Sequence, residues 1–399
     1  MPAEVAPSAR RVRYSRIREL AEMAMRMDGV LKLYFGESSI PTPDYIKQAA
    51  WQALQDGYTF YTENAGLPSL RRALAAHYRR LHGVELDPER EIVITASGVQ
   101  ALNVAIRAVL DPGDEALLLT PAWPNGAANV WLANGVAREI PHRMAGGRFQ
   151  VDFEALEAAV GGRTRLLVYT SPSNPLGWVA RVEDQAALLA LARRHGLWLL
   201  ADEVYERLYW RTETLGEPAP SILRLCTRQD AVIVVQSFSK SYSMTGWRLG
   251  WLVARADLAG KAAQLNEYIV SHAPSFAQKA AETALERGEE ELKAMLARLK
   301  QNRDLGLEAL RAMPGVTTPE PEGAFYLFPR IAGVEDSFEF CRRLLEETRV
   351  GLAPGSAFGE GGEGAVRICY AAERTILEEA MKRLGAFLKN WQPVRAPVL

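Results

Sequence analysis

A chain of 399 residues is long enough for two lobes, since domains average roughly 100 to 200 residues. Its 47 basic side chains nearly balance its 48 acidic ones, which argues against nucleic acid or an anionic membrane as a partner and leaves small molecules and a second copy of the chain. Cys226, Cys341 and Cys369 are widely spaced and odd in number, so neither a disulfide framework nor a metal site is expected.

The first 20 residues are basic but lack the apolar core of a signal peptide. The chain also contains no run of about 18 apolar residues that would span a membrane. We therefore expect a soluble protein of the cytoplasm.

Helical and extended patterns alternate from about residue 45 onward. Residues 44–57 and 67–83 have the apolar spacing of helices. Apolar runs of strand length follow at residues 91–95, 115–120, 165–170, 197–201 and 231–236, with helical patterns between them. Continuous apolar runs that alternate with helices predict a mostly parallel sheet covered on both faces. We assign residues 45–285 to this large domain.

The pattern changes after residue 280. A long charged helix is expected over residues 281–313, ending before Pro314-Gly315, and shorter strand patterns follow at residues 323–329 and 365–371. We assign residues 286–399 to a smaller α+β domain, and residues 1–44 to an N-terminal segment that forms part of it.

Unusual residues follow each of the five apolar runs. In chain order they are Ser97 with Gly98, Trp123, Asn174, Asp202 with Tyr205, and Ser237 with Lys240. Because ligands of open α/β sheets bind at the carboxyl ends of the strands, we expect these residues to face one crevice.

Lys240 follows an apolar strand and stands among serines, which fits a solvated surface lysine poorly. Burial disfavours the ammonium form and lowers the pKa of a lysine, which suits a Schiff base with an aldehyde. The hydroxyl groups, Arg248 and the amides of residues 97–99 at a helix start would together bind a dianion, most simply a phosphate. Asp202 is either the acid that keeps a pyridine nitrogen protonated or a helix cap.

On these residues the chain resembles the class I and II, fold-type I aminotransferases, which use pyridoxal 5'-phosphate and are related to aspartate aminotransferase. The resemblance runs from about Leu33 to the last helix and rests on the motifs TASGVQAL, TPAWP, SPSNP, ADEVY and SFSKSYSMTGWRLGW. It implies a large domain with a mostly parallel, seven-stranded sheet flanked by helices and a smaller α+β domain. It also implies a role for each motif residue: Lys240 forms the Schiff base, Asp202 pairs with the pyridine nitrogen, Tyr205 and Asn174 bond the ring hydroxyl, Trp123 stacks on the ring, and Ser97, Gly98, Val99, Ser237 and Arg248 bind the phosphate.

Further matches concern the substrate and a partner subunit. Arg367, in GGEGAVRICYA, stands where a guanidinium binds the substrate α-carboxylate, and Gly36, in LYFGESSIPTP, where a backbone amide approaches that carboxylate. Trp123 and Asn174 belong to the substrate site as well. Tyr61, in FYTENAGLPSLR, stands where a tyrosine reaches the phosphate of the neighbouring subunit, which implies a homodimer with shared active sites.

Two departures from the family pattern bear on the substrate. Residues 174–178 read Asn-Pro-Leu-Gly-Trp where the family often has Asn-Pro-Thr-Gly, which predicts a bulkier, more apolar loop wall. The segment NEYIVSHAPSF lacks the second arginine with which the dicarboxylate-specific branch binds a substrate side chain. Five aromatic residues are candidates either for an apolar pocket or for the core: Tyr34, Phe35, Trp178, Phe325 and Tyr326.

A glycine-rich motif and two histidines are not expected to belong to the site. GEGGEG, at residues 359–364, matches the dinucleotide fingerprint letter for letter, but it precedes a strand pattern instead of opening a helix, so we interpret it as a loop before Arg367. His77 and His195 fall on or at the end of helices and are expected at the surface or at helix caps.

The sequence therefore predicts ping-pong transfer of an amino group from an L-amino acid, aspartate or an aromatic one, to a 2-oxo acid such as 2-oxoglutarate. The freed Lys240 amine acts as general base and acid. A β-lyase or an oxidase-like enzyme on the same scaffold is the alternative, because a fold does not fix a function. A ligand-sensing module of a transcription regulator is disfavoured, because only about 35 residues precede Gly36 and the net charge is near zero.

Overall fold

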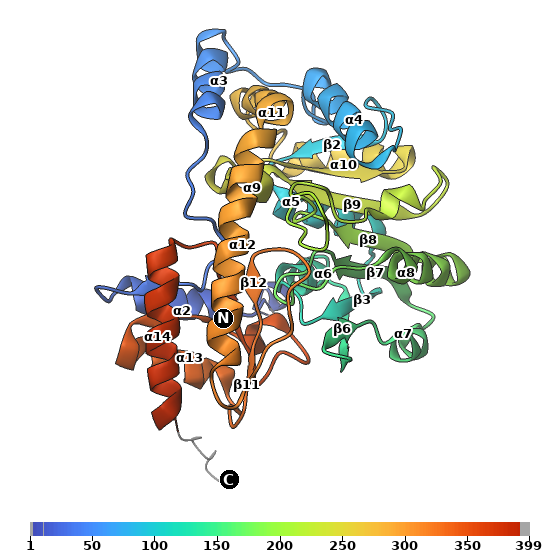
Figure 1. Ribbon diagram of the computed structural model, residues 1–399. Helices are drawn as coiled ribbons and strands as arrows, with labels where there is room; N and C mark the ends of the chain where they lie inside the picture. Colours follow the sequence, from blue (N-terminus) through green and yellow to red (C-terminus); the bar gives the residue numbers. More distant parts are fainter. Residues whose placement is uncertain (1–2, 11, 392–399) are drawn as a thin grey trace.

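The computed structural model describes residues 3–10 and 12–391 (Figure 1). Its larger part is built on a seven-stranded sheet with the order β2-β10-β9-β8-β7-β3-β4. Neighbouring strands are parallel except at β10, which is antiparallel to β2 and β9. The strands are β2 (Ile92–Thr95), β3 (Glu115–Thr120), β4 (Val136–Pro141), β7 (Thr164–Thr170), β8 (Trp198–Asp202), β9 (Val232–Ser237) and β10 (Gly250–Ala254). The predicted α/β fold is confirmed, and the five predicted strands match within one residue at each end.

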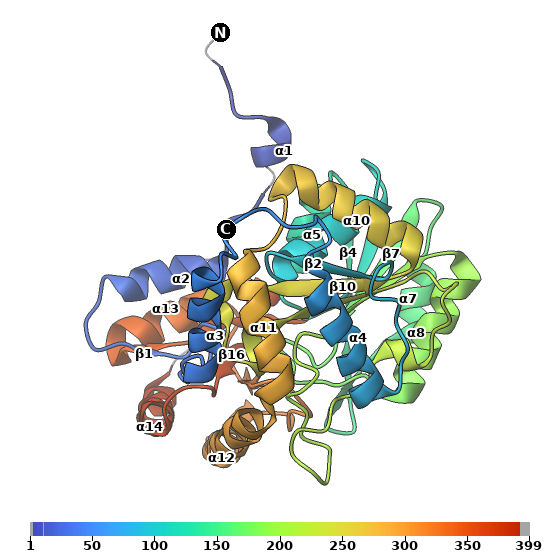
Figure 2. The same ribbon diagram turned by 90° about the horizontal axis from the view of Figure 1, so that it is seen from above.

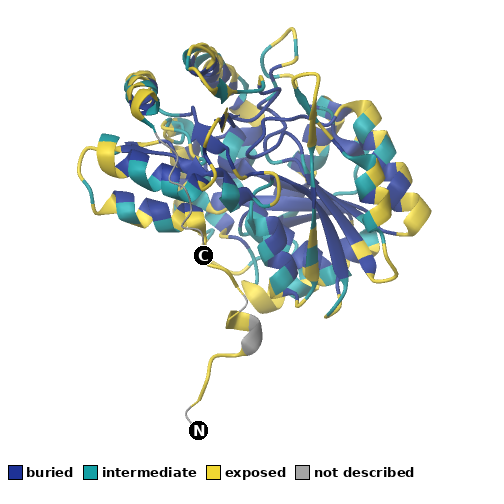
Figure 3. Ribbon diagram, turned by 90° about the horizontal axis from the view of Figure 1, so that it is seen from below, coloured by how far each residue is buried: buried dark blue, intermediate teal, exposed yellow. Residues whose placement is uncertain are grey.

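Helices cover both faces of this sheet. One face carries α5 (Gly98–Val109), α6 (Asn125–Leu132) and α10 (Ala256–Ile269), and the other carries α4 (Pro68–His82), α7 (Phe153–Ala159) and α8 (Val182–His195). Successive residues of one strand enter two separate apolar clusters: Leu166 and Val168 pack on the first face, Leu167 and Tyr169 on the second. Both faces of the five predicted strands are therefore buried (Figure 3), which is why these strands appear in the sequence as continuous apolar runs.

In the part of the chain that the structure describes, the smaller part of the molecule combines short sheets with four helices. The helices are α2 (Arg16–Met25), α12 (Glu289–Arg311), α13 (Ser337–Thr348) and α14 (Arg374–Asn390). The sheets pair β1 (Leu31–Lys32) with β14 (Val350–Gly351), β11 (Val316–Thr317) with β13 (Arg330–Ile331), and β12 (Tyr326–Leu327) and β15 (Ala353–Pro354) with β16 (Val366–Cys369). The β1–β14 pair brings the N-terminal segment beside the C-terminal part of the chain. The domain boundaries at residues 44 and 285 stay predictions.

The prediction of one long helix over residues 281–313 is wrong. The chain instead forms α11 (Ser275–Arg287) and α12, separated at Gly288. A Cβ atom at Gly288 would lie 2.5 Å from the Ala284 carbonyl oxygen and 2.8 Å from the Tyr242 ring, so this junction requires glycine. The break redirects the chain: α11 packs against α3 (Asp44–Gln55) and α4, whereas α12 runs beside α14 (Figure 1).

The remaining elements are short. The N-terminal α1 (Pro7–Arg10) projects from the body of the molecule in Figure 2 and contacts α6. A hairpin of β5 (Arg143–Ala145) and β6 (Arg148–Gln150) follows β4. Within residues 3–10 and 12–391, no helix is both long enough and apolar enough to cross a bilayer.

Candidate active site

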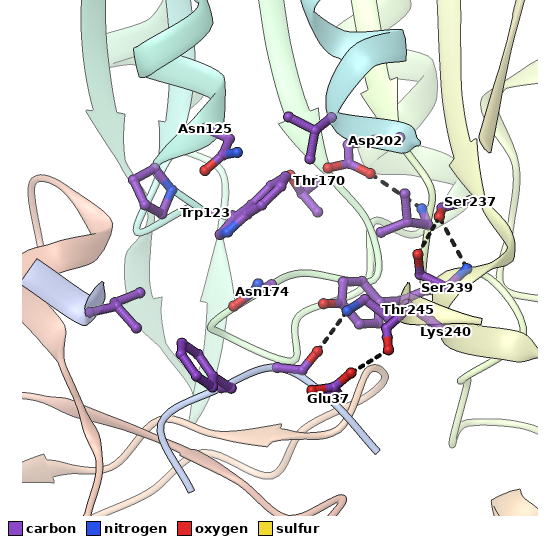
Figure 4. A pocket seen from close by; sticks show the side chains of 18 of the residues that line it. Glu37, Trp123, Asn125, Thr170, Asn174, Asp202, Ser237, Ser239, Lys240 and Thr245 are labelled. Atoms are coloured by element: carbon purple, nitrogen blue, oxygen red, sulfur yellow. Dashed lines mark hydrogen bonds between the residues drawn. The ribbon is translucent and has the colours of Figure 1, made fainter. Parts of the chain in front are cut away.

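A cavity of about 630 Å³ opens at the carboxyl ends of β7, β8 and β9, where loops of the large sheet meet residues of the smaller part of the molecule. Figure 4 shows Trp123, Asn174, Asp202, Ser237 and Lys240 converging on it. Of the residues predicted from the sequence, those that line it are Gly36, Gly98, Val99, Trp123, Asn174, Asp202, Tyr205, Ser237, Lys240, Arg248 and Arg367. Ser97 and Tyr61 do not line it.

Lys240 enters the cavity from α9 (Phe238–Ser241), a single turn that begins directly after β9. Its Nζ donates a hydrogen bond of 2.6 Å to the Gly36 carbonyl oxygen, and it lies 5.7 Å from the centroids of the Tyr205 and Phe325 rings. Burial lowers the pKa of Lys240 to about 8, and the charges of Arg367 and Arg248 act in the same direction. A substantial share of this amine is therefore neutral near physiological pH.

Asp202 ends β8 and is buried. Burial raises the pKa of Asp202 to about 7, although the Val204 amide and the charge of Lys240 both favour the ionised carboxylate. Its Oδ1 accepts a hydrogen bond of 3.3 Å from that amide. A buried carboxyl of this kind is suited to pair with a cationic group placed in the cavity.

One end of the cavity presents donors for an anion. The hydroxyl groups of Ser237 and Ser239 lie 2.8 Å apart, Arg248 lines the same region, and α5 begins at Gly98 with its free amides. A Cβ atom at Gly98 would lie 3.3 Å from the Gln236 carbonyl oxygen, a tight contact, so glycine allows α5 to begin close to the end of β9 without displacing this carbonyl. Hydroxyls, a guanidinium and a helix N-terminus together form a site for a phosphate-like dianion.

Ser97 precedes α5 at this end, and its side chain caps that helix. Its φ of 113° lies in the left-handed region, and its Oγ accepts a hydrogen bond of 3.3 Å from the Gln100 amide. The side chain therefore caps α5, and what this position offers the cavity is the start of the helix that follows it.

Arg367, on β16, lines the cavity beside Asn174 and is buried. It donates one hydrogen bond of 2.9 Å to Asn174 Oδ1 and another to the Tyr34 carbonyl oxygen. Its Nε is buried and has no hydrogen-bond partner among the described residues. Because a buried donor without a partner is costly, this guanidinium is arranged for an additional acceptor such as a carboxylate.

Tyr326 is a site residue that the sequence left undecided between pocket and core. It is buried on β12, lines the cavity, and its hydroxyl lies 2.6 Å from that of Tyr205. The Arg367 guanidinium lies 4.6 Å from its ring centroid, and a Cβ atom at Gly36 would overlap its hydroxyl. A tyrosine in a two-residue strand gives no signal of this role in the sequence.

Two other expectations need correction, and two open questions are answered. The bulkier wall predicted from residues 174–178 is wrong, because Leu176 and Trp178 are buried in the core and do not line the cavity. Of the other aromatic candidates, Phe35 lines the cavity, whereas Tyr34 and Phe325 belong to the core. His77 is not at the surface: it is buried beside Glu206. GEGGEG is followed by β16, so its rejection as a dinucleotide fingerprint is confirmed.

The anion cradle consists of Ser237, Ser239, Arg248 and the N-terminus of α5. This cradle, Lys240 and Arg367 line one cavity at the carboxyl edge of a mostly parallel sheet. Such a cavity is typical of enzymes that work on small charged molecules. The model of the family "aminotransferase class I and II" matches residues 29–384. An aspartate aminotransferase of Pyrococcus horikoshii is 36% identical over 95% of this chain and 96% of its own length. An aromatic-amino-acid aminotransferase of Thermococcus litoralis is 36% identical over 94% and 96% of the two chains.

A solved structure of an aminotransferase has the same fold as this chain. The crystal structure of an aspartate aminotransferase from Thermotoga maritima superposes with a TM-score of 0.89 and 34% identity, covering 96% of this chain and all of that one. The chain belongs to the class I and II aminotransferases. It is thus an enzyme that moves an amino group between an amino acid and a 2-oxo acid.

Proposed function

We propose that this aminotransferase binds pyridoxal 5'-phosphate in the cavity and works by a ping-pong mechanism in which Lys240 carries the proton transfers. The observation that carries the proposal is the position of Lys240, which has a pKa of about 8 and lies in one cavity with the anion cradle and Arg367.

The residues present fit this cofactor. The hydroxyls of Ser237 and Ser239, Arg248 and the N-terminus of α5 would bind the phosphate. Asp202 would pair with the ring nitrogen, Tyr205 and Asn174 would bond the ring hydroxyl, and Trp123 would lie against the ring face. When bound, the cofactor supplies an aldehyde that takes up the amino group and a ring that draws electron density from the substrate Cα.

Arg367 would bind the substrate, and Lys240 would transfer the proton. Arg367, oriented by Asn174 and the Tyr34 carbonyl, would hold the substrate α-carboxylate and so place Cα near the lysine. The Lys240 amine would then accept the proton from Cα and deliver it to the cofactor carbon. A pKa of about 8 suits both directions, because neither the amine nor the ammonium form is scarce near neutral pH.

The substrates are proposed to be aspartate or an aromatic amino acid as donor and 2-oxoglutarate as acceptor. The relatives named aspartate aminotransferase and aromatic-amino-acid aminotransferase support this choice. We also propose a homodimer with shared active sites and a cytoplasmic location, which the three free cysteines support.

The test is a quantitative transamination assay. The purified protein, loaded with pyridoxal phosphate, is incubated with 2-oxoglutarate and aspartate or phenylalanine, and both products are measured. We expect the donor-derived oxo acid and glutamate in equal amounts. Oxo acid without an equal amount of glutamate would overturn the proposal in favour of the lyase or oxidase-like alternative.

Lys240→Ala isolates the role of the lysine, and Lys261→Ala, on the exposed side of α10, is the matched control. We expect turnover to fall by at least about 10²- to 10⁴-fold in the first variant and to stay unchanged in the second. Borohydride treatment followed by peptide mass spectrometry gives a second readout, since the cofactor mass should be found on Lys240 in the native protein.

A further inference from the structure

Two side-chain amides connect the anion cradle to the loop that carries Tyr61. Gln100 lies in the first turn of α5, and Asn266 lies near the end of α10, which packs beside α5 (Figure 2). Asn266 is fully buried, and Gln100 is half-buried. Neither residue lines the cavity, and the proposed function gives neither a role. We call this pair the amide bridge.

The amide bridge begins at the cradle. A helix leaves its first backbone amides without a partner inside the helix. In α5 the Ser97 hydroxyl accepts a hydrogen bond of 3.3 Å from the Gln100 amide. The Gln100 Oε1 accepts one of 2.7 Å from the Ala96 amide, so the side chain fixes the backbone just before the helix. The amides of Gly98 and Val99, two residues of the cavity lining, are left for a bound anion.

The hydrogen bonds of the amide bridge have only one orientation. Gln100 Nε2 donates a hydrogen bond of 2.7 Å to Asn266 Oδ1. Asn266 Nδ2 in turn donates to the carbonyl oxygens of Asn64 and Ser271, at 3.0 and 3.2 Å. At one end of the bridge the Ala96 amide can only donate, and at the other end the two carbonyl oxygens can only accept. Both side-chain amides are therefore fixed by the backbone groups that they bind.

The far end of the amide bridge holds two loops that meet at Tyr61. Asn64 lies three residues after Tyr61, and Ser271 precedes His272, whose ring packs edge-on against the Tyr61 ring at 5.6 Å. Both carbonyl oxygens bind the same Nδ2 group of Asn266. Because a buried amide that moves leaves its partners without hydrogen bonds, Asn266 keeps these loops and the start of α5 in one arrangement.

We propose that Gln100 and Asn266 are positioning residues for the cofactor phosphate, which hold the free amides of α5 and the loop of Tyr61 in place before the phosphate binds. The inference rests on the proposed function, because it takes the anion in the cradle to be the phosphate of pyridoxal phosphate. Donors that are already ordered bind an anion more tightly than donors that must be ordered first. The affinity for the phosphate should therefore depend on the amide bridge.

The test compares Gln100→Met with Asn103→Leu, one turn further along α5. Asn103 Nδ2 also donates a hydrogen bond of 2.7 Å to a buried side-chain amide, that of Asn129, and neither of these two residues lines the cavity. Both substitutions replace an amide by an apolar group of similar size. The ligands are pyridoxal phosphate and pyridoxal, which share the ring and the aldehyde and differ in the phosphate.

The full chain, freed of cofactor, is titrated with each ligand while tryptophan fluorescence is followed. For Gln100→Met we expect the Kd of pyridoxal phosphate to rise about 10-fold and the Kd of pyridoxal to change less than about 2-fold. Asn103→Leu should change neither value. Gln100→Ala removes the same two bonds without adding an apolar end group and should behave like Gln100→Met. Urea unfolding checks that each variant is folded.

Tyr61→Phe tests the far end of the amide bridge. If the bridge places Tyr61, a protein without the Tyr61 hydroxyl has less to lose when the bridge is broken. We therefore expect the double variant Gln100→Met/Tyr61→Phe to raise the Kd of pyridoxal phosphate by less than the product of the two single effects. A rise equal to that product would overturn the part of the inference that concerns this loop.

An equal rise for pyridoxal phosphate and pyridoxal, no rise for either, or the same rise in Asn103→Leu would overturn the role of the amide bridge. Failure of the proposed function differs, because the native protein would then transfer no amino group or bind no pyridoxal phosphate. In that event titration with inorganic phosphate decides. Weaker phosphate binding by Gln100→Met than by the native protein and Asn103→Leu would support the inference, and equal or absent binding in all three would overturn it.

Discussion

The hydroxyl groups of Tyr205 and Tyr326 lie 2.6 Å apart, and both side chains are buried in the wall of the cavity. Burial raises the pKa of each phenol well above its ordinary value, so both hydroxyls keep their protons at neutral pH and one donates to the other. Tyr326 thereby orients the hydroxyl that we propose for the cofactor, and it also lies under the Arg367 guanidinium.

Tyr326→Phe tests this coupling. The substitution leaves the buried Tyr205 hydroxyl without its partner, so we expect the free energy of unfolding of the cofactor-free protein to fall by about 1 to 2 kcal/mol. Tyr205→Phe should have a similar effect, and the double variant should be little worse than either single one. Urea unfolding of the four proteins measures the coupling as a double-mutant cycle, and additive losses would show that the two hydroxyls do not depend on each other.

At the same scale, the sequence identified the residues that sit where a buried strand ends. Trp123, Asn174, Asp202 and Lys240 line the cavity because parallel strands bring their carboxyl ends to one edge. Arg18, which also lines the cavity, was not predicted, because it comes from a short helix whose place at the cavity depends on packing between distant parts of the chain. The hydroxyl of Ser97 does not reach the cavity for a local reason: the backbone conformation of Ser97 turns this hydroxyl to the helix it caps. The phosphate role of Ser97 stays a prediction that concerns its backbone amide.

Among the secondary-structure elements, the break between α11 and α12 shows how tertiary contacts override helix propensity. Residues on both sides of Gly288 favour helix, yet the Tyr242 ring and the Ala284 carbonyl occupy the space where a side chain would stand. We expect Gly288→Ala to destabilise the protein by about 1 to 3 kcal/mol, since the extra methyl overpacks a filled site.

The matched control for this substitution is Gly260→Ala. Gly260 lies inside α10 with nothing within 4 Å of a Cβ atom, so the same change there should stabilise the protein by about 0.5 to 1 kcal/mol through helix propensity alone. Chemical unfolding measures both variants. Stabilisation by Gly288→Ala would mean that the contacts at the junction do not determine the break.

A second feature at this scale is the buried cluster of Glu206, His77 and His82, which ties the turn after β8 to α4. Glu206 lies 3.0 Å from His82 Nε2 and 3.7 Å from His77 Nε2. Burial alone would raise the pKa of Glu206, but the hydrogen bonds and charges of the two histidines outweigh burial and lower it below its ordinary value. Burial alone would lower the pKa of His82, but the hydrogen bond and charge of Glu206 outweigh burial and raise it. For His77 burial is the larger effect, so its pKa is lowered.

The Glu206–His82 pair should therefore stabilise the fold most at mildly acidic pH, whereas the lowered pKa of His77 acts in the opposite direction as pH falls. The contribution of Glu206 is present above its unfolded pKa of about 4.3 and is lost as pH falls toward its lower folded pKa. The contribution of His82 is complete below about 6.5 and is lost as pH rises through its higher folded pKa.

Glu206→Gln tests this pH dependence. We expect it to lower the free energy of unfolding by about 2 to 4 kcal/mol near pH 5.5 and by less at pH 4. Urea unfolding from pH 4 to 8 measures the profile, with Glu85→Gln, an exposed partner of Arg79, as the control that should change it little. A loss independent of pH would contradict the assigned pKa directions.

The elements that the sequence predicted well are those whose burial is uniform. The five predicted strands are apolar on both faces, so each is a continuous run that stands out from the helices. β4 was not predicted because its residues are mostly half-buried or exposed, and β10 because it follows the lysine motif without the helix that precedes a parallel strand.

For the whole molecule, an exposed group of aromatic side chains bears on assembly. Phe60, Tyr61 and Tyr268 are 80%, 90% and 86% exposed, and the Tyr61 ring packs edge-on against His272 at 5.6 Å. Tyr61 lies outside the cavity of its own chain. Exposed aromatic rings favour an interface, and a tyrosine held at the surface is available to a neighbouring subunit.

Subunit mixing distinguishes a shared active site from an independent one. We expect a homodimer by sedimentation, and Tyr61→Phe should weaken cofactor binding about 10-fold if it removes one hydrogen bond to the phosphate. In a mixed dimer of Lys240→Ala and Tyr61→Phe subunits, one site would contain Lys240 from the second subunit and Tyr61 from the first. That site should therefore bind the cofactor with native affinity and regain activity at low cofactor concentration, although neither parent does so. If Tyr61 acts only within its own chain, mixing restores nothing, and a monomer in solution would contradict the shared site altogether.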